Sequence, residues 1–301
     1  MKFQPIAFIS IKQLMHPIVA IGLLFFPVQV YSQNKYSDEE CKLRTGFEYG
    51  AIAGIYIADK ASAAFYSGEP DKENYVNYVF NNPHWYEELW KMDFFKDTAY
   101  VLDYPEKMSY APAFSFGLFV KYDLNCKTGI YAQFYYVKLR ANDIVTVEVD
   151  PPIDALYERK IRHCPITGIE ERNILDLGIS HSFGLNKVSR LSVGAGVSMN
   201  NTLVKEHYIY ISEKKYNLMR IYGNNLYIPN SNQQIFQVRQ GGIGFGMFAS
   251  IGVRFEFSPV VAIEPGASVH FMKINLDETS HLTPQMDFYL KLSFRDLLRF
   301  N

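Results

Sequence analysis

The stretch GGIGFGMFASIGVRFEFSPVVAIEPGASVHF, residues 241–271, decides the fold. Apolar residues alternate with small or charged residues along both halves of this stretch, and Ser258 and Pro259 form a corner between them. Because successive side chains of a β-strand point to opposite faces, the pattern predicts a hairpin with one apolar face and one small or charged face. The apolar positions are Ile243, Phe245, Met247, Ala249, Ile251, Val253 and Phe255, then Ile263, Pro265, Ala267, Val269 and Phe271.

The second face of this hairpin distinguishes a membrane barrel from a soluble sandwich. It carries glycines and isolated charges, among them Arg254 and Glu264, which suit a narrow polar interior better than an open surface. Each strand also exceeds the roughly five or six residues usual in soluble sheets and is long enough to cross a bilayer at a tilt. We therefore predict a transmembrane hairpin, with a secreted soluble β-protein as the alternative.

The same alternation predicts six further strands, at residues 47–57, 110–122, 128–139, 173–183, 189–200 and 285–295. The connections alternate between long and short, and the long ones are insertions at residues 59–108, 141–168 and 201–239. Outer-membrane barrels have an even number of strands, with long loops outside and short turns on the periplasmic side. The predicted fold class is thus all-β, a single-chain antiparallel transmembrane β-barrel of eight strands, with ten strands as the alternative.

Two of these insertions carry local signals of structure. In the first, Trp85, Leu89 and Met92 recur at helical spacing, which predicts a short helix that holds the loop together, with a ligand platform formed by the two tryptophans as the alternative. In the second, the run at residues 144–149 is expected to extend a strand beyond the membrane.

The first 33 residues have the features of a signal peptide. Residues 17–30 are almost wholly apolar, and Ser32 supplies a small side chain at the expected cut. An uncleaved helical anchor is disfavoured, because the apolar run is too short to span a bilayer comfortably. We expect residues 1–33 to be removed, residues 34–46 to form a periplasmic lead-in and residues 47–301 to form a barrel in the cell outer membrane.

Composition agrees with this assignment. Aromatic residues make up 16% of the 301 residues, with 22 Tyr and 23 Phe against 2 Trp. The mean hydropathy of -0.09 excludes a helical membrane protein, but barrel strands alternate and their hydropathy averages out. The net charge of -1 and the lack of a basic block argue against nucleic acid as a partner.

Charged residues recur on the predicted inward faces of the strands. A barrel of eight strands encloses only enough space for its own side chains, so inward charges must pair with one another. We predict an ionic network that fills the lumen, in preference to a catalytic cluster or an ion path. Its predicted members are Glu48, Lys121, Asp176, Arg254, Glu256, Glu264, Asp287, Lys291 and Arg295.

The segments NILDLGI at residues 173–179, LSVGAGV at 191–197 and IEPG at 263–266 resemble the eight-stranded outer-membrane β-barrel family abundant in Bacteroidota, an OmpA-like or porin-family small barrel. The resemblance runs from about residue 47 to the C-terminus and implies the fold and the location rather than an activity. Such proteins often end in an aromatic residue that the barrel-assembly machinery recognises, whereas here Phe300 is penultimate. Because some relatives serve a secretion or gliding apparatus, the resemblance also implies an accessory role of that kind.

Motifs of enzymes and cofactor sites are lacking in the sequence. The glycines at residues 241–246 open an alternating strand with no helical pattern after it, so they are not a nucleotide-binding fingerprint. His181, Ser182 and His270 are weak candidates for a hydrolase at the barrel rim, and we disfavour them. We predict a non-enzymatic protein without a cofactor or a metal.

The three cysteines leave two alternatives open. Cys41 precedes the first strand and Cys126 lies in the first short turn, which places both at the same rim in an oxidising compartment. Either these two form a disulfide and leave Cys164 alone, or all three thiols are unpaired.

The predicted function follows from these features. We expect a non-enzymatic outer-membrane barrel with a filled polar lumen, which acts through its extracellular loops or periplasmic rim as a binding or assembly component. The third insertion is rich in Tyr and Asn, the composition of an adaptable contact surface. The expected partners are outer-membrane lipid and a protein bound through the loops. A small channel or porin is the alternative.

Overall fold

The computed structural model describes residues 45–82, 85, 88–89, 99–149, 160–185, 189–221, 235–276 and 281–295. The predicted signal peptide, most of the lead-in, Cys41 and Met92 lie outside these residues.

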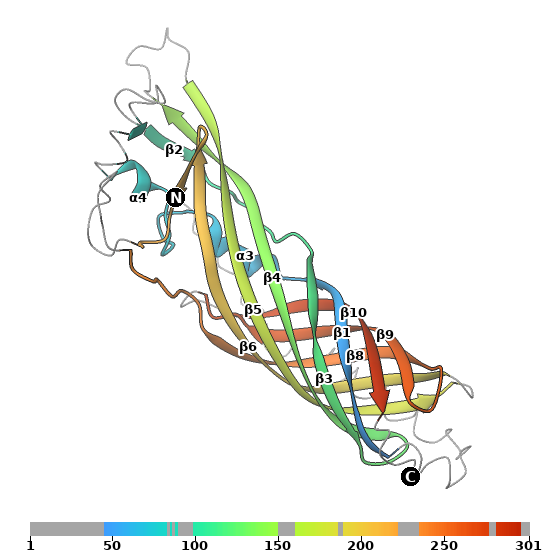
Figure 1. The fold of residues 1–301 in the computed structure, drawn as a ribbon. Coiled ribbons are helices and arrows are strands. Elements are labelled where there is room, and N and C mark those ends of the chain that lie inside the picture. Colours follow the sequence, from blue (N-terminus) through green and yellow to red (C-terminus); the bar gives the residue numbers. More distant parts are fainter. Residues whose placement is uncertain are drawn as a thin grey trace, which may run out of the picture. The chain divides into compact units, whose positions relative to one another are not determined.

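Eight strands form a closed antiparallel ring (Figure 1). Each strand pairs with the next in the order β1, β3, β4, β5, β6, β8, β9, β10, and β10 pairs with β1 to close the ring. The predicted eight-stranded antiparallel barrel is confirmed. Two further strands, β2 and β7, pair outside the ring, so the sheet has ten strands while the described part of the ring has eight. The strands of the ring are β1 (Gly46–Ile57), β3 (Ala113–Asp123), β4 (Thr128–Val149), β5 (Lys160–Gly184), β6 (Ser189–Ile211), β8 (Ile243–Glu256), β9 (Val261–Lys273) and β10 (Leu282–Arg295).

The outward face of the ring is apolar and exposed. Phe114, Leu118 and Phe245 are 66%, 67% and 65% exposed, whereas their inward neighbours Ser115 and Phe119 are buried. The alternation therefore predicted the faces of these strands correctly. The exposed set, which we call the apolar band, includes Phe47, Tyr49, Ile55, Phe114, Phe116, Leu118, Val120, Ile130, Phe134, Leu177, Ile179, Val197, Phe245, Met247, Ile251, Phe271, Phe288 and Leu290.

The two ends of the ring differ in their connections. Short links join β3 to β4, β5 to β6 and β8 to β9 at one end, which we call the turn end. In the first of these links, the Asn125 Oδ1 atom accepts hydrogen bonds from the backbone N–H groups of Lys127 and Thr128 at 2.9 and 2.8 Å. This side chain closes the turn, as Asn does in many tight turns. The long connections lie at the opposite end, the loop end.

Three strands continue well past the loop end of the ring. β3 pairs with β4 only as far as Val137, whereas β5 pairs with β4 as far as Val149. Parts of the expected insertions at residues 141–168 and 201–239 are therefore strand, which includes the run at 144–149. The predicted ends of these strands were too early because the alternation continues with its apolar side chains on the inward face.

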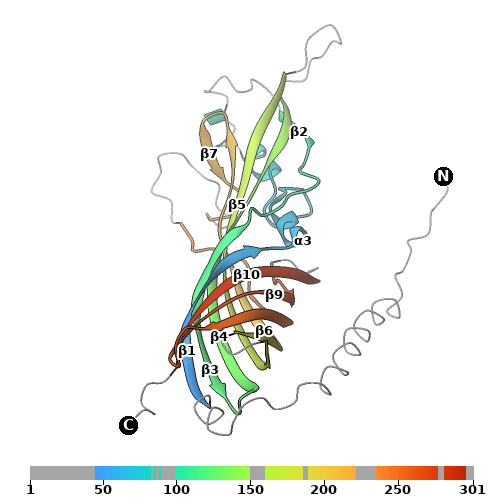
Figure 2. The same cartoon turned by 90° about the vertical axis from the view of Figure 1, so that its right-hand side faces the viewer.

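Beyond the ring, the long strands form the wall of a second unit, which we call the cap. β2 (Ala99–Asp103) pairs with β4, and β7 (Lys214–Asn217) pairs with β6 (Figure 2). The short helices α3 (Lys60–Ala63), η2 (Ala64–Tyr66) and α4 (Asn77–Phe80) follow β1 in the same region. The cap thus comprises these five elements and the parts of β4, β5 and β6 beyond the ring.

The cap is packed around a hydrophobic core that continues into the ring, where it includes Tyr135 and Ile174. Val79 from α4, Val147 from β4, Ile166 from β5 and Ile209 from β6 are fully buried in one cluster. Trp85 is helical and buried, as predicted, with its ring 5.1 Å from that of Tyr78 and 5.9 Å from that of Tyr216. The tryptophan packs the cap rather than presenting a platform for a ligand. Among the helices of the described residues, none is long and apolar enough to cross a bilayer.

Candidate functional site

The turn end of the lumen contains a group of ion pairs centred on Glu48. Arg254 Nη1 donates to Glu48 Oε1 at 2.6 Å, and Glu48 is buried. Arg295 Nη2 lies 3.5 Å from Glu48 Oε2 and 3.3 Å from Asp123 Oδ2, while Lys121 Nζ is 2.9 Å from Asp123 Oδ1. Each buried charge here faces a charge of the opposite sign, which a low-dielectric interior requires.

Two members of this group were missed in the sequence. The predicted strand at residues 110–122 stops one residue before Asp123, whereas β3 includes Asp123. Arg190 lies two residues before Ser192 on the same inward face of β6, and its Nη2 atom is 3.4 Å from Glu256 Oε2. Arg190 lies within the predicted strand 189–200, so continuing the inward alternation from Ser192 back to Arg190, and from Lys121 on to Asp123, would have found both residues.

The middle of the lumen holds a network of hydrogen bonds around Asp176. Its Oδ2 atom accepts from Gln133 Nε2 at 2.8 Å and lies 2.9 Å from His270 Nε2. The Tyr135 hydroxyl is also 2.9 Å from His270 Nε2. All four side chains are buried, so the network fixes the packing of β4, β5 and β9 against one another.

The remaining predicted lumen residues lie on β9 and β10. Ser115 donates a hydrogen bond to Asp287 Oδ1 at 2.8 Å. Lys291 Nζ lies over the ring of Tyr289 at 4.5 Å and over that of Tyr131 at 5.2 Å, in cation–π contacts. Glu264 faces the same space. The predicted set is therefore brought together along one lumen, in the groups around Glu48 and Asp176 and the pair of residues on β10.

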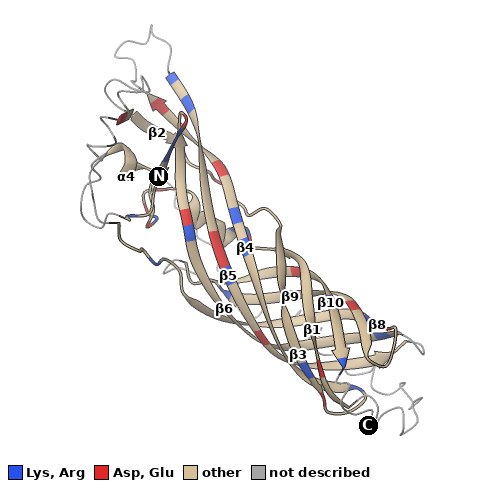
Figure 3. Cartoon of the chain, in the orientation of Figure 1, with Lys and Arg blue, Asp and Glu red and all other residues tan. Residues whose placement is uncertain are grey.

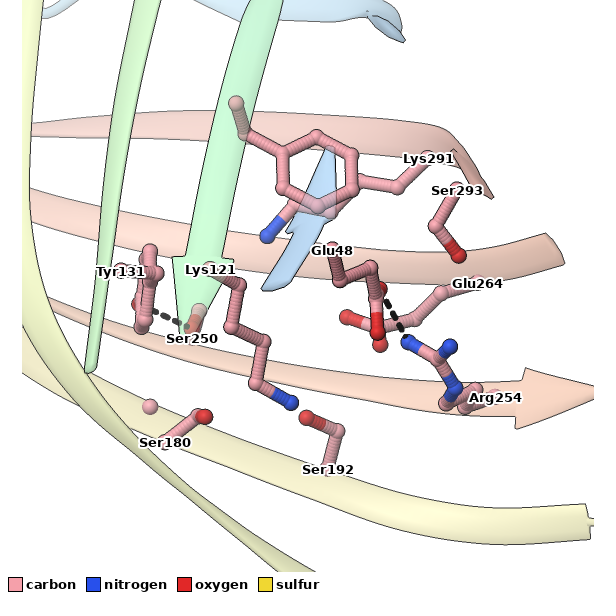
Figure 4. A pocket seen from close by; sticks show the side chains of 12 residues that line it. Glu48, Lys121, Tyr131, Ser180, Ser192, Ser250, Arg254, Glu264, Lys291 and Ser293 are labelled. Carbon is pink, nitrogen blue, oxygen red and sulfur yellow. Dashed lines mark hydrogen bonds and ion pairs between the residues drawn. The ribbon is translucent and has the colours of Figure 1, made fainter. Parts of the chain in front are cut away.

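A small cavity remains between these groups (Figure 4). It is lined by Lys121, Tyr131, Arg254, Glu264 and Lys291, with several serines, and its volume is about 20 Å³. A water molecule needs roughly 10–15 Å³ measured in this way, so the cavity holds little more than one water. The lumen is filled by its own side chains at this level.

The loop end of the lumen is bridged by a second buried ionic cluster, which we call the latch. Arg172 Nε donates to Glu170 Oε1 at 2.6 Å, and both side chains are 0% exposed. The hydroxyls of Tyr66 and Tyr110 donate to Glu170 Oε2 at 2.7 and 2.9 Å. A Cβ atom on Gly168 would lie 2.1 Å from the Tyr66 ring, so only glycine leaves room for this contact.

The latch joins the cap to the ring. Arg172 Nη1 donates to Gln285 Oε1 of β10 at 3.1 Å, and Arg172 Nη2 donates to Ser62 Oγ of α3 at 3.1 Å. Gln285 Oε1 also accepts from the backbone N–H of Asp59 at 2.9 Å. Burial, together with the neighbouring Glu170 carboxylate, raises the pKa of Tyr66 well above its usual value, so the phenol stays protonated and keeps its hydrogen bond. The latch was not predicted from the sequence.

His207 is the buried histidine of the cap. Its Nε2 atom donates to the backbone carbonyl of Tyr66 at 3.3 Å, and its ring packs against that of Tyr66 at 5.2 Å. Its Nδ1 atom is buried and has no hydrogen-bond partner in the part of the chain that the structure describes. Burial lowers the pKa of His207 to about 3, so the side chain is neutral near pH 7.

The candidates for a hydrolase are spread over separate parts of the barrel. His181 Nδ1 lies 3.1 Å from Thr128 Oγ1 near the turn end, whereas His270 is in the middle of the lumen with Asp176. Ser182 is buried on the same strand as His181. Among the described residues, no serine hydroxyl is hydrogen-bonded to either histidine, and these residues hold no group of three side chains suited to a metal.

The cysteines are only partly described. Cys164 is a free and buried thiol, and burial raises its pKa to about 11. The predicted pairing of Cys41 with Cys126 stays a prediction, because Cys41 lies outside the described residues.

Known proteins resemble this chain in structure but not in sequence. No protein-family model matches the chain, and no curated protein matches it. Neisserial surface protein A is 10% identical, with a TM-score of 0.42, over 84% of this chain and 98% of that one. OprG, an outer-membrane protein of Pseudomonas aeruginosa, is 9% identical, with a TM-score of 0.40, over 84% and 97%. Ail, the attachment invasion locus protein of Yersinia pestis, in complex with the heparin analogue sucrose octasulfate, is 9% identical, with a TM-score of 0.34, over 83% of this chain and 99% of that one.

These likenesses are distant, so the fold assignment rests on the strand pairing of this chain. The predicted kinship with the Bacteroidota family stays a prediction.

Proposed function

We propose that the protein is a non-enzymatic outer-membrane β-barrel that holds a binding module, the cap, at the membrane surface. The apolar band supports the membrane location. Its side chains, such as Phe114 and Phe245, are exposed all along the ring, and a surface of this size would be unstable in water. A closed barrel pairs all the backbone N–H and C=O groups of its strands through hydrogen bonds, because it has no free edge, and it is therefore stable in lipid.

The filled lumen favours an anchoring role for the barrel and argues against a permanently open channel. Ion pairs around Glu48 occupy the turn end, a cavity of about 20 Å³ lies next to them, and the latch bridges the loop end. Ions need a continuous water path, and side chains interrupt it at each of these levels. In planar bilayers, we therefore expect the protein to insert without a steady conductance. A stable single-channel conductance would favour the small-channel alternative.

The ordered cap is the observation that carries the binding proposal. A loop that only closes a hairpin needs a few residues, whereas the cap contributes many buried apolar side chains to the core and has two additional strands. Its outer face displays apolar side chains in water: Tyr100, Ile144 and Ile161 are 55%, 51% and 45% exposed. Tyr100 and Ile161 are both register partners of Glu148, and Ile144 precedes Glu148 by four residues on the same face of β4. We call these three residues the cap patch.

The cap patch is a suitable contact surface for a protein partner, which includes a subunit of a larger envelope assembly. Exposed apolar groups surrounded by polar ones mark interaction sites on many proteins. The patch has a tyrosine, a residue that contributes strongly to interfaces because it buries a large ring and a polar hydroxyl.

Site-specific photo-crosslinking in the native membrane tests this proposal. A photoreactive residue at Tyr100 or Ile161 should give one adduct of defined mass, and Ile144→Asp should abolish it. The same residue at Lys107, an exposed polar position of the cap region, is the matched control. An identical adduct at Lys107, or the lack of any adduct at Tyr100 and Ile161, contradicts a binding role for the patch.

A further inference from the structure

The outward face of β4 changes character where the strand leaves the ring. Phe134 and Tyr136 belong to the apolar side of this face, and the next two outward residues are Lys138 and Arg140. Their direction is certain from the pattern, because Val137 and Leu139 between them are fully buried on the inward face. Two exposed cations, about 7 Å apart along the strand, therefore lie immediately beyond the apolar band.

A bulge in β6 adds a third cation at the same level. The pairing of β5 with β6 shifts between Ile169 and Glu170, which leaves Lys205 as the additional residue of β6. Lys205 Nζ lies 3.0 Å from Glu171 Oε2, and Glu171 is the register partner of Lys138. Lys138 and Lys205 thus flank one carboxylate across three neighbouring strands, which are about 4.8 Å apart. Figure 3 shows charged positions gathered along this part of β4, β5 and β6.

The balance of charge on this surface is positive. Glu171 pairs with Lys205, and the next carboxylate on β6, Glu206, pairs with Lys215 at 2.6 Å. The side chains of Lys138 and Arg140 form no ion pair with any described residue. The surface therefore carries an excess of two positive charges directed outward beside the apolar band. Arg140 offers five N–H donors and Lys138 offers three.

We propose that Lys138, Arg140 and Lys205 bind the phosphate group of a lipid headgroup in the leaflet next to the cap. This proposal depends on the membrane location proposed above. A lipid whose acyl chains cover Phe134 and Leu175 places its headgroup directly at the level of the three cations. Arg binds a phosphate through two parallel hydrogen bonds, and Lys adds a point charge. A free phosphate ion or an acidic protein would gain nothing from the adjacent apolar band, whereas a lipid contacts both surfaces.

Native mass spectrometry of the purified full-length protein in detergent micelles tests this inference. The probes are lipid A with both phosphates, the same glycolipid without phosphates, and inorganic phosphate. We expect the phosphorylated glycolipid to bind at least about tenfold more tightly than the dephosphorylated one. Each Lys or Arg side chain near an anionic lipid surface adds a favourable electrostatic contribution to binding. The double variant Lys138→Gln/Arg140→Gln should lose about tenfold in affinity for phosphorylated lipid A, and added salt should reduce the difference.

The matched control is Lys107→Gln/Arg162→Gln, which removes the same charge from exposed positions away from the band. Equal binding of both glycolipids, or equal losses in the two double variants, overturns the proposal. Binding of inorganic phosphate as strong as that of lipid A overturns the choice of a lipid. The charge-conserving variant Lys138→Arg/Arg140→Lys should keep most of the affinity. This result distinguishes a loss of affinity caused by the missing charges from one caused by misfolding. Failure of these tests leaves membrane insertion of the barrel unaffected, and insertion is measured independently by partition into detergent.

Discussion

The ring and the cap share three strands but have opposite polarity. Within the ring, β5 presents Leu177 outward and Asp176 inward, whereas in the cap it presents Ile166 inward. β4 changes in the same way, from Phe134 outward to Val147 inward. The comparison teaches that the surroundings of each level decide which face is apolar. In the membrane location that we propose, the level that would meet lipid has a polar interior, and the level that would meet water has an apolar core.

The largest expected effect comes from breaking an ion pair inside the ring. Arg254→Met leaves the buried Glu48 without its closest partner at 2.6 Å and should reduce the free energy of unfolding by about 3–5 kcal/mol. Urea titration of the protein in lipid, followed by heat-modifiable migration on gels, measures this loss.

Two variants sharpen that result. Lys205→Met breaks the exposed pair with Glu171 outside the ring and should cost about 0–1 kcal/mol. Glu48→Gln/Arg254→Met removes both charges and should recover much of the loss. If Arg254→Met is no more destabilising than Lys205→Met, the lumen is solvated and the filled-lumen account is wrong.

A cavity in the cap core should have a smaller effect that stays local. Ile209→Ala removes buried methyl groups from the core shared with Ile166 and should cost the cap about 2–5 kcal/mol. Limited proteolysis should then cut the cap sooner, while the ring keeps its heat-modifiable migration. Val197→Ala, which shortens an exposed side chain of the apolar band, is the control and should leave proteolysis unchanged. Simultaneous loss of ring and cap would show that the two regions unfold as one unit.

An arginine on the outward face should distinguish the two levels directly. Ile251→Arg in the apolar band should reduce stability by about 2–4 kcal/mol, because the charge enters hydrocarbon. Ile144→Arg on the outward face of the cap should change stability by no more than about 0.5 kcal/mol, because the side chain is already in water. Equal effects at both positions would contradict the reversal of polarity.

In the cap, pH should change stability gradually through His207. His207 has a pKa of about 3 in the folded cap, below the ordinary value of about 6.5 in an unfolded chain. Between these two values the unfolded state binds the proton and the folded state does not, so stability falls as the pH falls from about 6.5 to 3. The slope is about 1.4 kcal/mol per pH unit. Hydrogen exchange of the cap amides measures it, and His207→Phe should remove the histidine contribution; an unchanged slope in that variant assigns the effect to other groups.

Much of the ring could be predicted because its signal is local. Each strand alternates within its own sequence, so the faces of β8, β9 and β10 and the inward positions of Glu48 and Arg254 follow without any knowledge of the neighbours. Asp123 and Arg190 needed only one further step of the same pattern. The lengths of β4, β5 and β6 were underestimated because the regular outward run of apolar residues ends where the strands leave the ring, as at Lys138 and Arg140 of β4.

The latch could not be predicted in the same way. Glu170 and Arg172 lie two residues apart and share a face with Asp176, so their inward direction was available from the sequence. Their partners were not, because Tyr66 and Tyr110 are 104 and 60 residues away from Glu170 and come from the long connection between β1 and β3. Contacts of this kind depend on the path of a loop, which no period in the sequence specifies.

The central claim is that one strand passes from lipid to water while its apolar face turns from outside to inside. A spin-label scan of the outward positions of β4, from Ile130 to Ile144, tests it most directly in reconstituted membranes. The account predicts that labels at Ile130 and Phe134 are accessible to oxygen, which dissolves in hydrocarbon, and that labels at Arg140 and Ile144 are accessible to a water-soluble nickel complex. The change from accessibility to oxygen to accessibility to the nickel complex should fall close to Lys138. Accessibility to the nickel complex at all these positions would contradict the account, since the whole outward face would then be in water.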